Sequence, residues 1–223
     1  MFKLYCFLQS ENDAQQDAFT ASGAAARTLV QATCPTVTGY VQSRALTQQI
    51  GDRAPSYAAS AELYFANAAA LLDSWRQPEA LAGLWNNRAV TLSATVAGLV
   101  RCVIRLPAHH HEPGIKAVFP FNRRSGMSVT DFQTHWWQRH GPIAADTESA
   151  LYYPQCHPLP ACYENGAQPD YDGVTELHWR DFASADAAMA SEQMRVDQAT
   201  DAKRFTDPDV GIYLAEEEVI IAP

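Results

Sequence analysis

The sequence lacks the segments that would place a chain in a membrane. The opening residues, MFKLYCFLQS, are too few to span a bilayer or to read as a secretory signal peptide, and no run of about 18 apolar residues occurs. Runs of Lys or Arg are also missing beyond the pair Arg123 and Arg124, and the net charge is -9. Nucleic acid and anionic membranes both need a concentrated basic surface, so the sequence argues against these partners. We expect a soluble, cytoplasmic protein.

Several signatures of cofactor and metal chemistry are absent as well. The five cysteines are an odd number with no C-x-x-C pair, which argues against a full disulfide framework and against a zinc ribbon. The P-loop, the G-x-G-x-x-G fingerprint and the G-x-S-x-G elbow do not occur. Nucleotide, nicotinamide and serine-hydrolase chemistries are therefore unsupported.

What is present is an order of elements that occurs twice. With 47% hydrophobic residues, the chain can build a core without disulfides or a structural metal. Alternation, β-branched residues and capping signals predict strands at 2–9, 36–46, 58–66 and 89–106, and helices at 11–22 and 67–76. The segment 89–106 is either one long strand or a bent pair with Gly98 at the bend. The second half predicts strands at 115–122, 150–157, 173–179 and 211–221, with helices at 129–140 and 183–199. Each half is β-α-β-β-α-β, the ferredoxin-like split βαβ unit.

Two such units predict one α+β barrel. Each unit makes a four-stranded antiparallel sheet with helices on one face, so the other face needs a cover, and the second unit supplies it. We expect a first unit at 1–108, a linker at 109–113 and a second unit at 114–223. Three adjacent histidines, 109–111, fall at this boundary, and a solvated linker is favoured over a metal site there.

One helix of the second half carries strong local signals. Ser128 and Asp131 have the spacing of a capping box, which predicts that the helix begins just after Ser128. Gly141 accepts a left-handed conformation and Pro142 cannot continue a helix, so we expect the helix to end near His140.

Histidine ends an apolar stripe of this helix. Phe132, Trp136 and His140 follow at i, i+4 and i+8, whereas His135 lies on a second, polar stripe and is more typical of a surface residue. His140 either caps the helix, which the helix dipole favours, or acts in a site.

Polar side chains also share faces of two strands. Because strand side chains alternate, Tyr153, Gln155 and His157 lie on one face of their strand, and Glu176 and His178 lie on one face of the next. We expect all five to face the barrel lumen, which needs room for a ligand. Structural roles remain open for four of them: packing for Tyr153, a strand end in solvent for His157, a buried ion pair for Glu176 and a surface position for His178.

Such a lumen would suit a small-molecule site, since a histidine can act as general base and a tyrosine hydroxyl can stabilise an enolate. We predict that His140 or His157 removes a proton next to a carbonyl, while Tyr153 and Gln155 orient the substrate. The remaining predicted substrate-binding residues are Trp136, Glu176 and His178.

A family resemblance rests on many of these positions. They are Arg123, Gly126, Met127, Ser128, Phe132, His135, Trp136, His140, Gly141, Pro142, Tyr153, Gln155, His157, Tyr171, Asp172, Gly173, Glu176, Trp179, Phe205, Thr206 and Asp207. With them the chain resembles the EthD family, of the dimeric α+β barrel superfamily, over about residues 114–221. The first half shares only the element order, so the resemblance implies one working half and one structural half.

The resemblance leaves the reaction open. The family is named after a gene cluster for ethyl tert-butyl ether degradation, and superfamily relatives include cofactor-free cyclases, lactone isomerases, monooxygenases and haem-binding enzymes. We expect a cofactor-independent lyase or isomerase, of cyclase or dehydratase type, acting on a small hydrophobic carbonyl compound in a catabolic or secondary-metabolic pathway. Haem-linked or cofactor-free oxidation is a second hypothesis, and a non-enzymatic carrier or accessory protein is a third. Free sheet edges on each half favour a homodimer.

Overall fold

The computed structural model describes residues 1–10, 23–51, 54–85, 90–105 and 114–223. Its strands are β1(Phe2–Ser10), β2(Val37–Ala45), β3(Ala59–Phe65), β4(Val90–Arg105), β5(Ile115–Phe121), β6(Tyr152–Pro158), β7(Gly173–Trp179) and β8(Tyr213–Ile221). Its helices are α2(Gly23–Thr33), α3(Ala68–Trp75), α4(Pro78–Gly83), α5(Val129–His135), η3(Trp136–His140), α6(Gly141–Ala145), η4(Pro160–Gly166), α7(Phe182–Ala190), η5(Gln193–Gln198) and α8(Ala199–Phe205). The predicted helix at 11–22, the linker at 109–113 and the histidines at 109–111 lie outside the described residues.

The strands close into one antiparallel barrel in the order β1-β3-β2-β8-β5-β7-β6-β4, and β4 pairs with β1. Within this order, β4-β1-β3-β2 and β8-β5-β7-β6 are the same ferredoxin-like arrangement, which confirms the predicted fold. The two sheets join at β2–β8 and at β4–β6. Every described strand pairs on both sides, so the free sheet edges that favoured a homodimer are not present among them.

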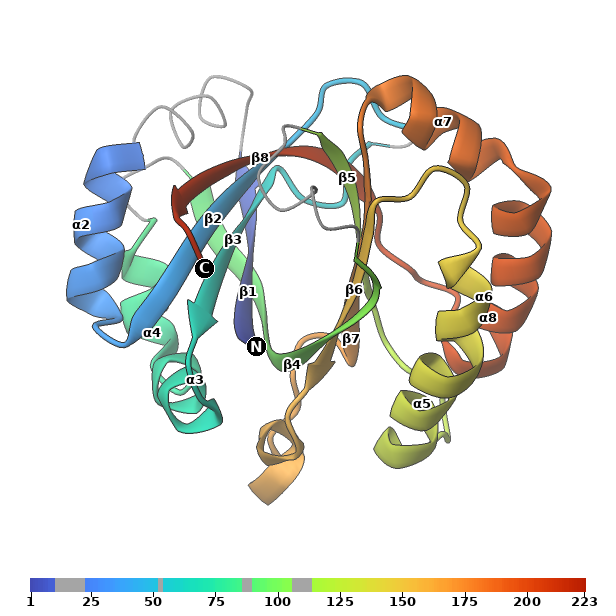
Figure 1. Ribbon diagram of the computed structural model, residues 1–223. Coiled ribbons are helices and arrows are strands. Elements are labelled where there is room, and N and C mark those ends of the chain that lie inside the picture. Colours follow the sequence, from blue (N-terminus) through green and yellow to red (C-terminus); the bar gives the residue numbers. More distant parts are fainter. Residues whose placement is uncertain (11–22, 52–53, 86–89, 106–113) are drawn as a thin grey trace.

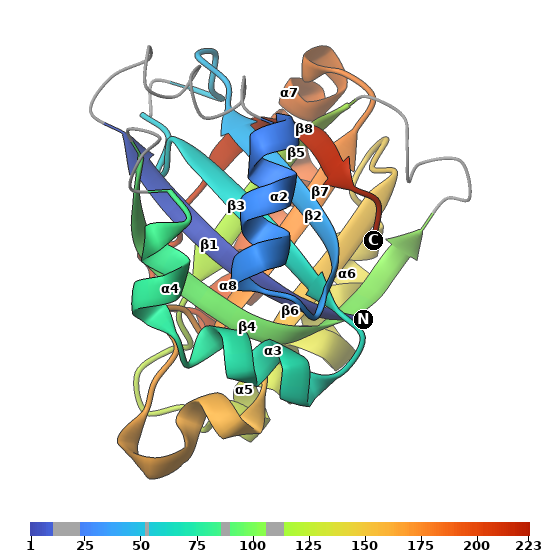
Figure 2. The same ribbon diagram turned by 90° about the vertical axis from the view of Figure 1, so that its left-hand side faces the viewer.

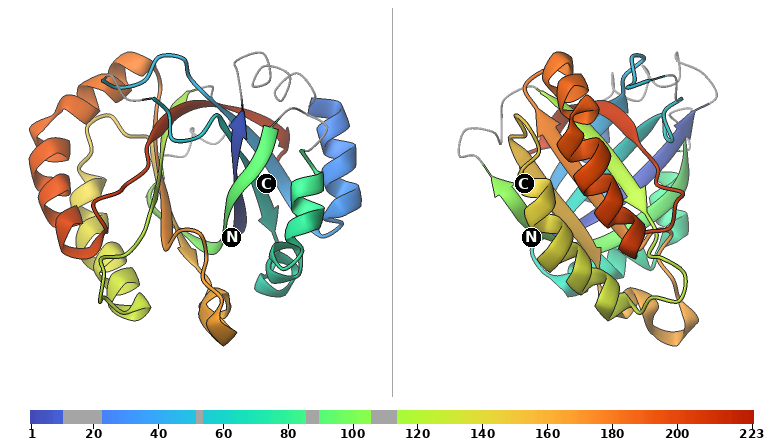
Figure 3. Two further views of the ribbon diagram at one scale, coloured as in Figure 1. Left: turned by 180° about the vertical axis from the view of Figure 1, so that it is seen from behind. Right: turned by 90° about the vertical axis from the view of Figure 1, so that its right-hand side faces the viewer.

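The helices lie outside the barrel in two groups. Figure 1 shows α2, α3 and α4 against the first-half sheet and α5 to α8 against the second-half sheet, with the barrel between them. Figure 2 shows α2 crossing the outer face of the first-half strands. Figure 3 shows α5, α6, α7 and α8 covering the second-half strands from the opposite side. Between each helical group and its sheet lies a separate apolar core.

Strand β4 passes from one sheet to the other at Gly98, which pairs with Lys3 of β1 and with Pro158 of β6. A Cβ atom on Gly98 would lie 2.6 Å from the carbonyl oxygen of His157. The predicted strand is therefore one long element, and the glycine permits the close approach of β6.

The helix that begins after Ser128 does not end at His140, contrary to the prediction. Ser128 is its N-cap and accepts a hydrogen bond from the Asp131 N–H at 3.0 Å. Gly141 has helical torsion angles, and its N–H bonds to the carbonyl of Trp136, five residues back, so a wide π turn precedes Pro142. The proline lies in the first turn of α6, where its missing N–H breaks no intrahelical hydrogen bond.

Among the described residues, no helix is both long enough and apolar enough to cross a membrane.

Candidate active site

The barrel lumen is filled by side chains. Tyr5, Phe7, Tyr57 and Tyr213 form its apolar part, and the rings of Tyr5 and Phe7 stack with centroids 5.6 Å apart. The cavity at its mouth has a volume of about 60 Å³, which suits a few waters rather than a substrate. The prediction of a lumen large enough for a ligand is therefore wrong for the part of the chain that the structure describes.

The rest of the lumen holds a buried charge network. Lys3 Nζ lies 2.6 Å from Glu62 and 2.7 Å from Glu176, and Lys116 contacts both carboxylates. Burial lowers the pKa of Lys3, but the Glu176 and Glu62 carboxylates outweigh it and raise that pKa well above its usual value. Burial would raise the pKa of Glu176, yet Lys3 and His178 hold it down to about 2. The network is charged and internally paired.

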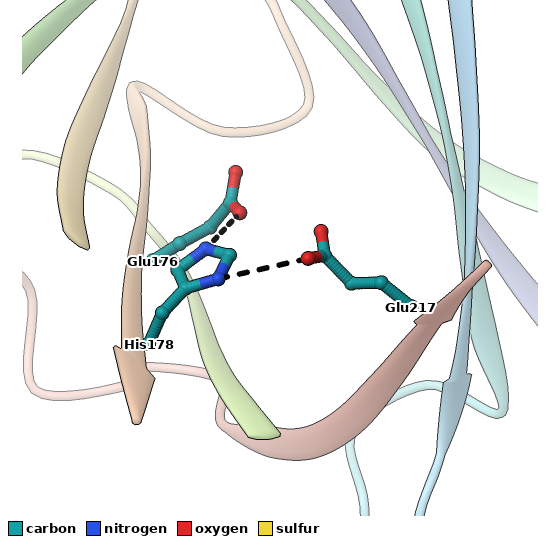
Figure 4. Close-up of side chains that lie close together, drawn as sticks. All are labelled: Glu176, His178 and Glu217. Carbon is teal, nitrogen blue, oxygen red and sulfur yellow. Dashed lines mark hydrogen bonds and ion pairs between the residues drawn. The ribbon is translucent and has the colours of Figure 1, made fainter. Parts of the chain in front are cut away.

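His178 lies at the mouth, between two carboxylates of this network (Figure 4). Its Nε2 is 2.8 Å from Glu176 Oε2, and its Nδ1 is 3.6 Å from Glu217 Oε2. The ligand atoms of these three residues lie within 4.8 Å of one another, close enough for a metal ion. However, Lys116 Nζ lies 2.9 Å from Glu217 and 3.4 Å from Glu176, so an ammonium already bridges the two carboxylates. We therefore assign Glu176 and His178 to the charge network rather than to a substrate site.

Tyr153, Gln155 and His157 face the helices, not the lumen. Tyr152 pairs with His178 across β6 and β7, and their rings lie 5.1 Å apart, which places Tyr152 on the lumen side. Alternation then directs Tyr153 to the outer face, where it packs in the core beneath the helices. The three residues do share one face, as predicted, but the expected direction of that face was wrong.

A cavity of about 510 Å³ lies between this outer sheet face and the second-half helices. Its volume is in the usual range for small-molecule sites. Its lining is Phe119, Phe121, Trp136, His140, Tyr153, Thr175, Leu177, Met189, Met194, Arg195, Gln198, Ala199, Ala202, Phe205, Thr206 and Val210. Three of the seven predicted site residues, Trp136, His140 and Tyr153, therefore meet at one cavity in the second half.

Two π turns frame this cavity. One is η3, which supplies Trp136 and His140, and the other is η5, which supplies Met194, Arg195 and Gln198. Such turns widen a helix and are frequent at functional sites. Gln155 Nε2 lies 3.3 Å from the Trp136 carbonyl, so β6 also holds the first turn in place.

His140 is oriented by a carboxylate that the sequence did not suggest. Its Nδ1 lies 3.1 Å from Oδ2 of Asp201 in α8, and Asp201 also lies 3.1 Å from His135 Nε2. Among the described residues no group hydrogen-bonds the other ring nitrogen of His140, Nε2. Burial lowers the pKa of His140 and the Asp201 carboxylate partly offsets that effect, so the imidazole is neutral at neutral pH. A neutral imidazole whose Nδ1–H donates to Asp201 carries its lone pair on Nε2.

Tyr153 is held as a hydrogen-bond donor. Gln155 Nε2 donates to the Tyr153 hydroxyl oxygen at 3.0 Å, so the hydroxyl hydrogen can be donated to a ligand. Burial raises the pKa of Tyr153, and the hydroxyl therefore keeps its proton at neutral pH.

His157 and Gln155 lie behind the cavity wall rather than in it. His157 Nε2 is 2.9 Å from Gln155 Oε1, and its ring packs on Trp136 with centroids 4.2 Å apart. Burial, with a contribution from Arg101, lowers the pKa of His157 to about 3, so the ring is neutral. His157 does not line the cavity, so the structure does not place it where the predicted catalytic role needs it.

The family-model comparison matches residues 124–209 to the EthD domain. The second half of the chain contains an EthD domain. All three of the predicted residues that line the cavity fall within these bounds, and so do Arg195 and Asp201. No curated protein matches the chain.

Solved structures share the whole fold at low sequence identity. An anthrone oxidase-like protein matches with a TM-score of 0.63 and 6% identity, covering 98% of this chain and 93% of that chain. A putative chlorite dismutase matches with a TM-score of 0.56 and 13% identity, covering 97% and 94%. A chlorite dismutase variant from Candidatus Nitrospira defluvii matches with a TM-score of 0.55 and 12% identity, covering 98% and 92%. At these identities the matches show the fold alone.

Proposed function

We propose that this protein is a cofactor-independent enzyme of lyase or isomerase type that removes a proton next to the carbonyl of a small hydrophobic compound. The observation that carries the proposal is the His140–Asp201 pair at the wall of the 510 Å³ cavity. Asp201 fixes the tautomer, which leaves the Nε2 lone pair of His140 as the general base. Tyr153 lines the same cavity and can donate to the carbonyl oxygen, where negative charge develops as the proton leaves.

The apolar lining strengthens both groups. Phe121, Trp136 and Phe205 surround the cavity with edge-to-face contacts, the first two with ring centroids 4.9 Å apart. In such surroundings the effective dielectric constant is low, so a hydrogen bond to a developing enolate is stronger than in water. Aldol cyclisation, dehydration and isomerisation all begin with this step. The same enolate can also react with dioxygen, so cofactor-free oxidation is a variant of this proposal.

Solvent deuterium exchange tests the proposal without the natural substrate. Loss of the methyl signal of 2-acetonaphthone in D₂O, followed by ¹H NMR, should be faster with the protein than in buffer. His140→Gln should slow the catalysed exchange by about 100-fold or more, because general-base catalysis is typically worth that much. Asp201→Asn should slow it by about 10-fold, as loss of an orienting carboxylate does elsewhere.

A matched control comes from the other face of the same sheet. His178 is also buried and paired with a carboxylate, but it lies at the lumen mouth. His178→Gln should keep the exchange rate of the wild type once folding is verified by its melting temperature. Exchange at the buffer rate with the wild type, or an undiminished rate in His140→Gln, would exclude the proposal.

Haem binding is the second candidate, favoured by one feature of the same histidine. His140 lines the cavity, and its Nδ1 is held by a carboxylate, which is typical of metal-ligating histidines. His140 would hold the iron, and Trp136 and Phe205 would pack against the ring; haem would supply oxygen and electron chemistry. Titration with haem should then give a Soret band that His140→Ala removes. Ketone binding without exchange and without a Soret band would instead indicate a carrier.

A further inference from the structure

Three polar side chains of the cavity already donate to protein acceptors. Thr175 Oγ1 donates to a backbone carbonyl at 2.9 Å, and Thr206 Oγ1 does so at 3.0 Å. Gln198 Nε2 donates to two side-chain oxygens, each at 2.8 Å. These groups therefore help to build the wall, and their donors are not available to a ligand without breaking a hydrogen bond.

Of the other polar side chains of the lining, Trp136 interacts with the Tyr153 hydroxyl, and three groups carry the argument for a ligand. Two are the His140 Nε2 and the Tyr153 hydroxyl hydrogen, both on buried residues. The third is the guanidinium of Arg195, on the π turn η5. Arg195 is the only arginine or lysine in the described lining. No described residue forms an ion pair or hydrogen bond with its guanidinium.

These groups differ in their exposure to solvent. Arg195 is exposed to solvent, whereas Tyr153 is 1% exposed and His140 is 9% exposed. A ligand that fills the cavity therefore has a buried carbonyl end, an apolar body and an end that reaches solvent beside a cation. An arginine fork matches a carboxylate with two parallel hydrogen bonds.

From this arrangement we infer that the cavity binds a hydrophobic carbonyl compound with a carboxylate at its outer end, which Arg195 recognises. The inference rests on the proposed function for the buried end and adds the substrate class. The protein discriminates between a keto acid and the corresponding neutral ketone, and Arg195 is the specificity-determining residue.

A pair of matched probes tests the inference by binding alone. The dissociation constants of 6-acetyl-2-naphthoic acid and 2-acetonaphthone, which share the naphthyl ketone body, are measured by isothermal titration calorimetry. For the wild type we expect the acid to bind about three- to ten-fold more tightly, the range of a partly exposed ion pair with bidentate geometry. In Arg195→Gln this preference should disappear while the affinity of 2-acetonaphthone stays unchanged. Because the pair is partly exposed, the preference should also shrink as salt is added.

Arg139→Gln is the control variant, since Arg139 is an exposed arginine on the facing turn η3 and does not line the cavity. It should keep the full preference for the acid. Equal affinities for the two probes in the wild type, failure of both probes to bind, or the same loss in Arg139→Gln would overturn the inference. Equal affinities, or the same loss in Arg139→Gln, leave the proposed function standing, because binding is measured without turnover and His140 is unchanged in both variants. Failure of both probes to bind counts against the proposed function as well.

Discussion

Replacing Glu62 by Gln should destabilise the protein strongly while leaving the cavity intact. Glu62 is fully buried in the lumen and contacts both Lys3 and Lys116, whose ammonium groups are also buried. Gln has nearly the same shape but no charge, so two ammonium groups lose one of their shared counter-charges. Removing one partner of a buried ion pair typically costs about 3–5 kcal/mol. For a chain of this size that corresponds to a fall in melting temperature of about 6–20 °C.

The stability difference between wild type and Glu62→Gln should depend on pH in a defined direction. Burial would raise the pKa of Glu62, but Lys116 and Lys3 hold it well below its usual value. A depressed pKa in the folded state contributes stability above the unfolded pKa of about 4.3, and that stability is lost as the pH falls through the folded pKa. The difference in unfolding free energy between wild type and Glu62→Gln should be full at neutral pH and shrink below about pH 4.

Urea denaturation at neutral and acidic pH measures these differences. Glu216→Gln is the control, since Glu216 forms a surface pair with Arg44 at 3.5 Å and both side chains are partly exposed. Such pairs contribute about 0–1 kcal/mol. Adding Lys116→Met to Glu62→Gln should recover much of the loss, because one buried ammonium, Lys3, then faces one buried carboxylate, Glu176, at 2.7 Å. A loss below about 1 kcal/mol in Glu62→Gln, or one that does not change with pH, would refute the network as described.

Three further predictions follow from the packing, the helix cap and the base. Gly98→Ala should destabilise by at least about 1–3 kcal/mol in urea denaturation, because the new methyl group would meet the His157 carbonyl at 2.6 Å. Ser128→Ala should cost about 1 kcal/mol in the same assay through loss of the helix cap. In a pH–rate profile, the exchange rate should fall with acid at a midpoint below the ordinary histidine pKa of about 6.5, because burial lowers the pKa of His140. Asp201→Asn should move this midpoint lower still, because the Asp201 carboxylate raises the pKa of His140.

The fold could be predicted because its signals are local. Alternation and β-branched residues locate strands within a few residues of their observed bounds, and β7 agrees at both ends. The order β-α-β-β-α-β then leaves few arrangements, because helices on one sheet face leave the other face to be covered. The helix α2 was not predicted, since the sequence signals placed the first helix earlier, at 11–22, next to the first strand.

The site was predicted only in part because its geometry depends on two non-local choices. Alternation places Tyr153 and His157 on one face, but only pairing with β7 decides which way that face points. The π turn before Pro142 depends on Gln155 and Trp136, which meet only in the folded chain. Regular helical spacing therefore placed the two histidines of this helix on different stripes, whereas the structure brings both to one carboxylate.

Asp201 and Arg195 were missed, although a helical pattern was available for both. Arg195, Gln198, Asp201 and Phe205 recur at spacings of three or four residues, which is one side of a helix. Nothing in that pattern alone says that the side with a carboxylate and an arginine lies against His140.

A crystal structure of the protein with 6-acetyl-2-naphthoic acid tests the central claim most directly, because it shows where a ligand binds. The account predicts density between the second-half sheet and its helices, with the ketone oxygen about 3 Å from the Tyr153 hydroxyl and the carboxylate at Arg195. Density at the lumen mouth beside His178 and Glu217 instead, or a cavity closed by side chains, would contradict it.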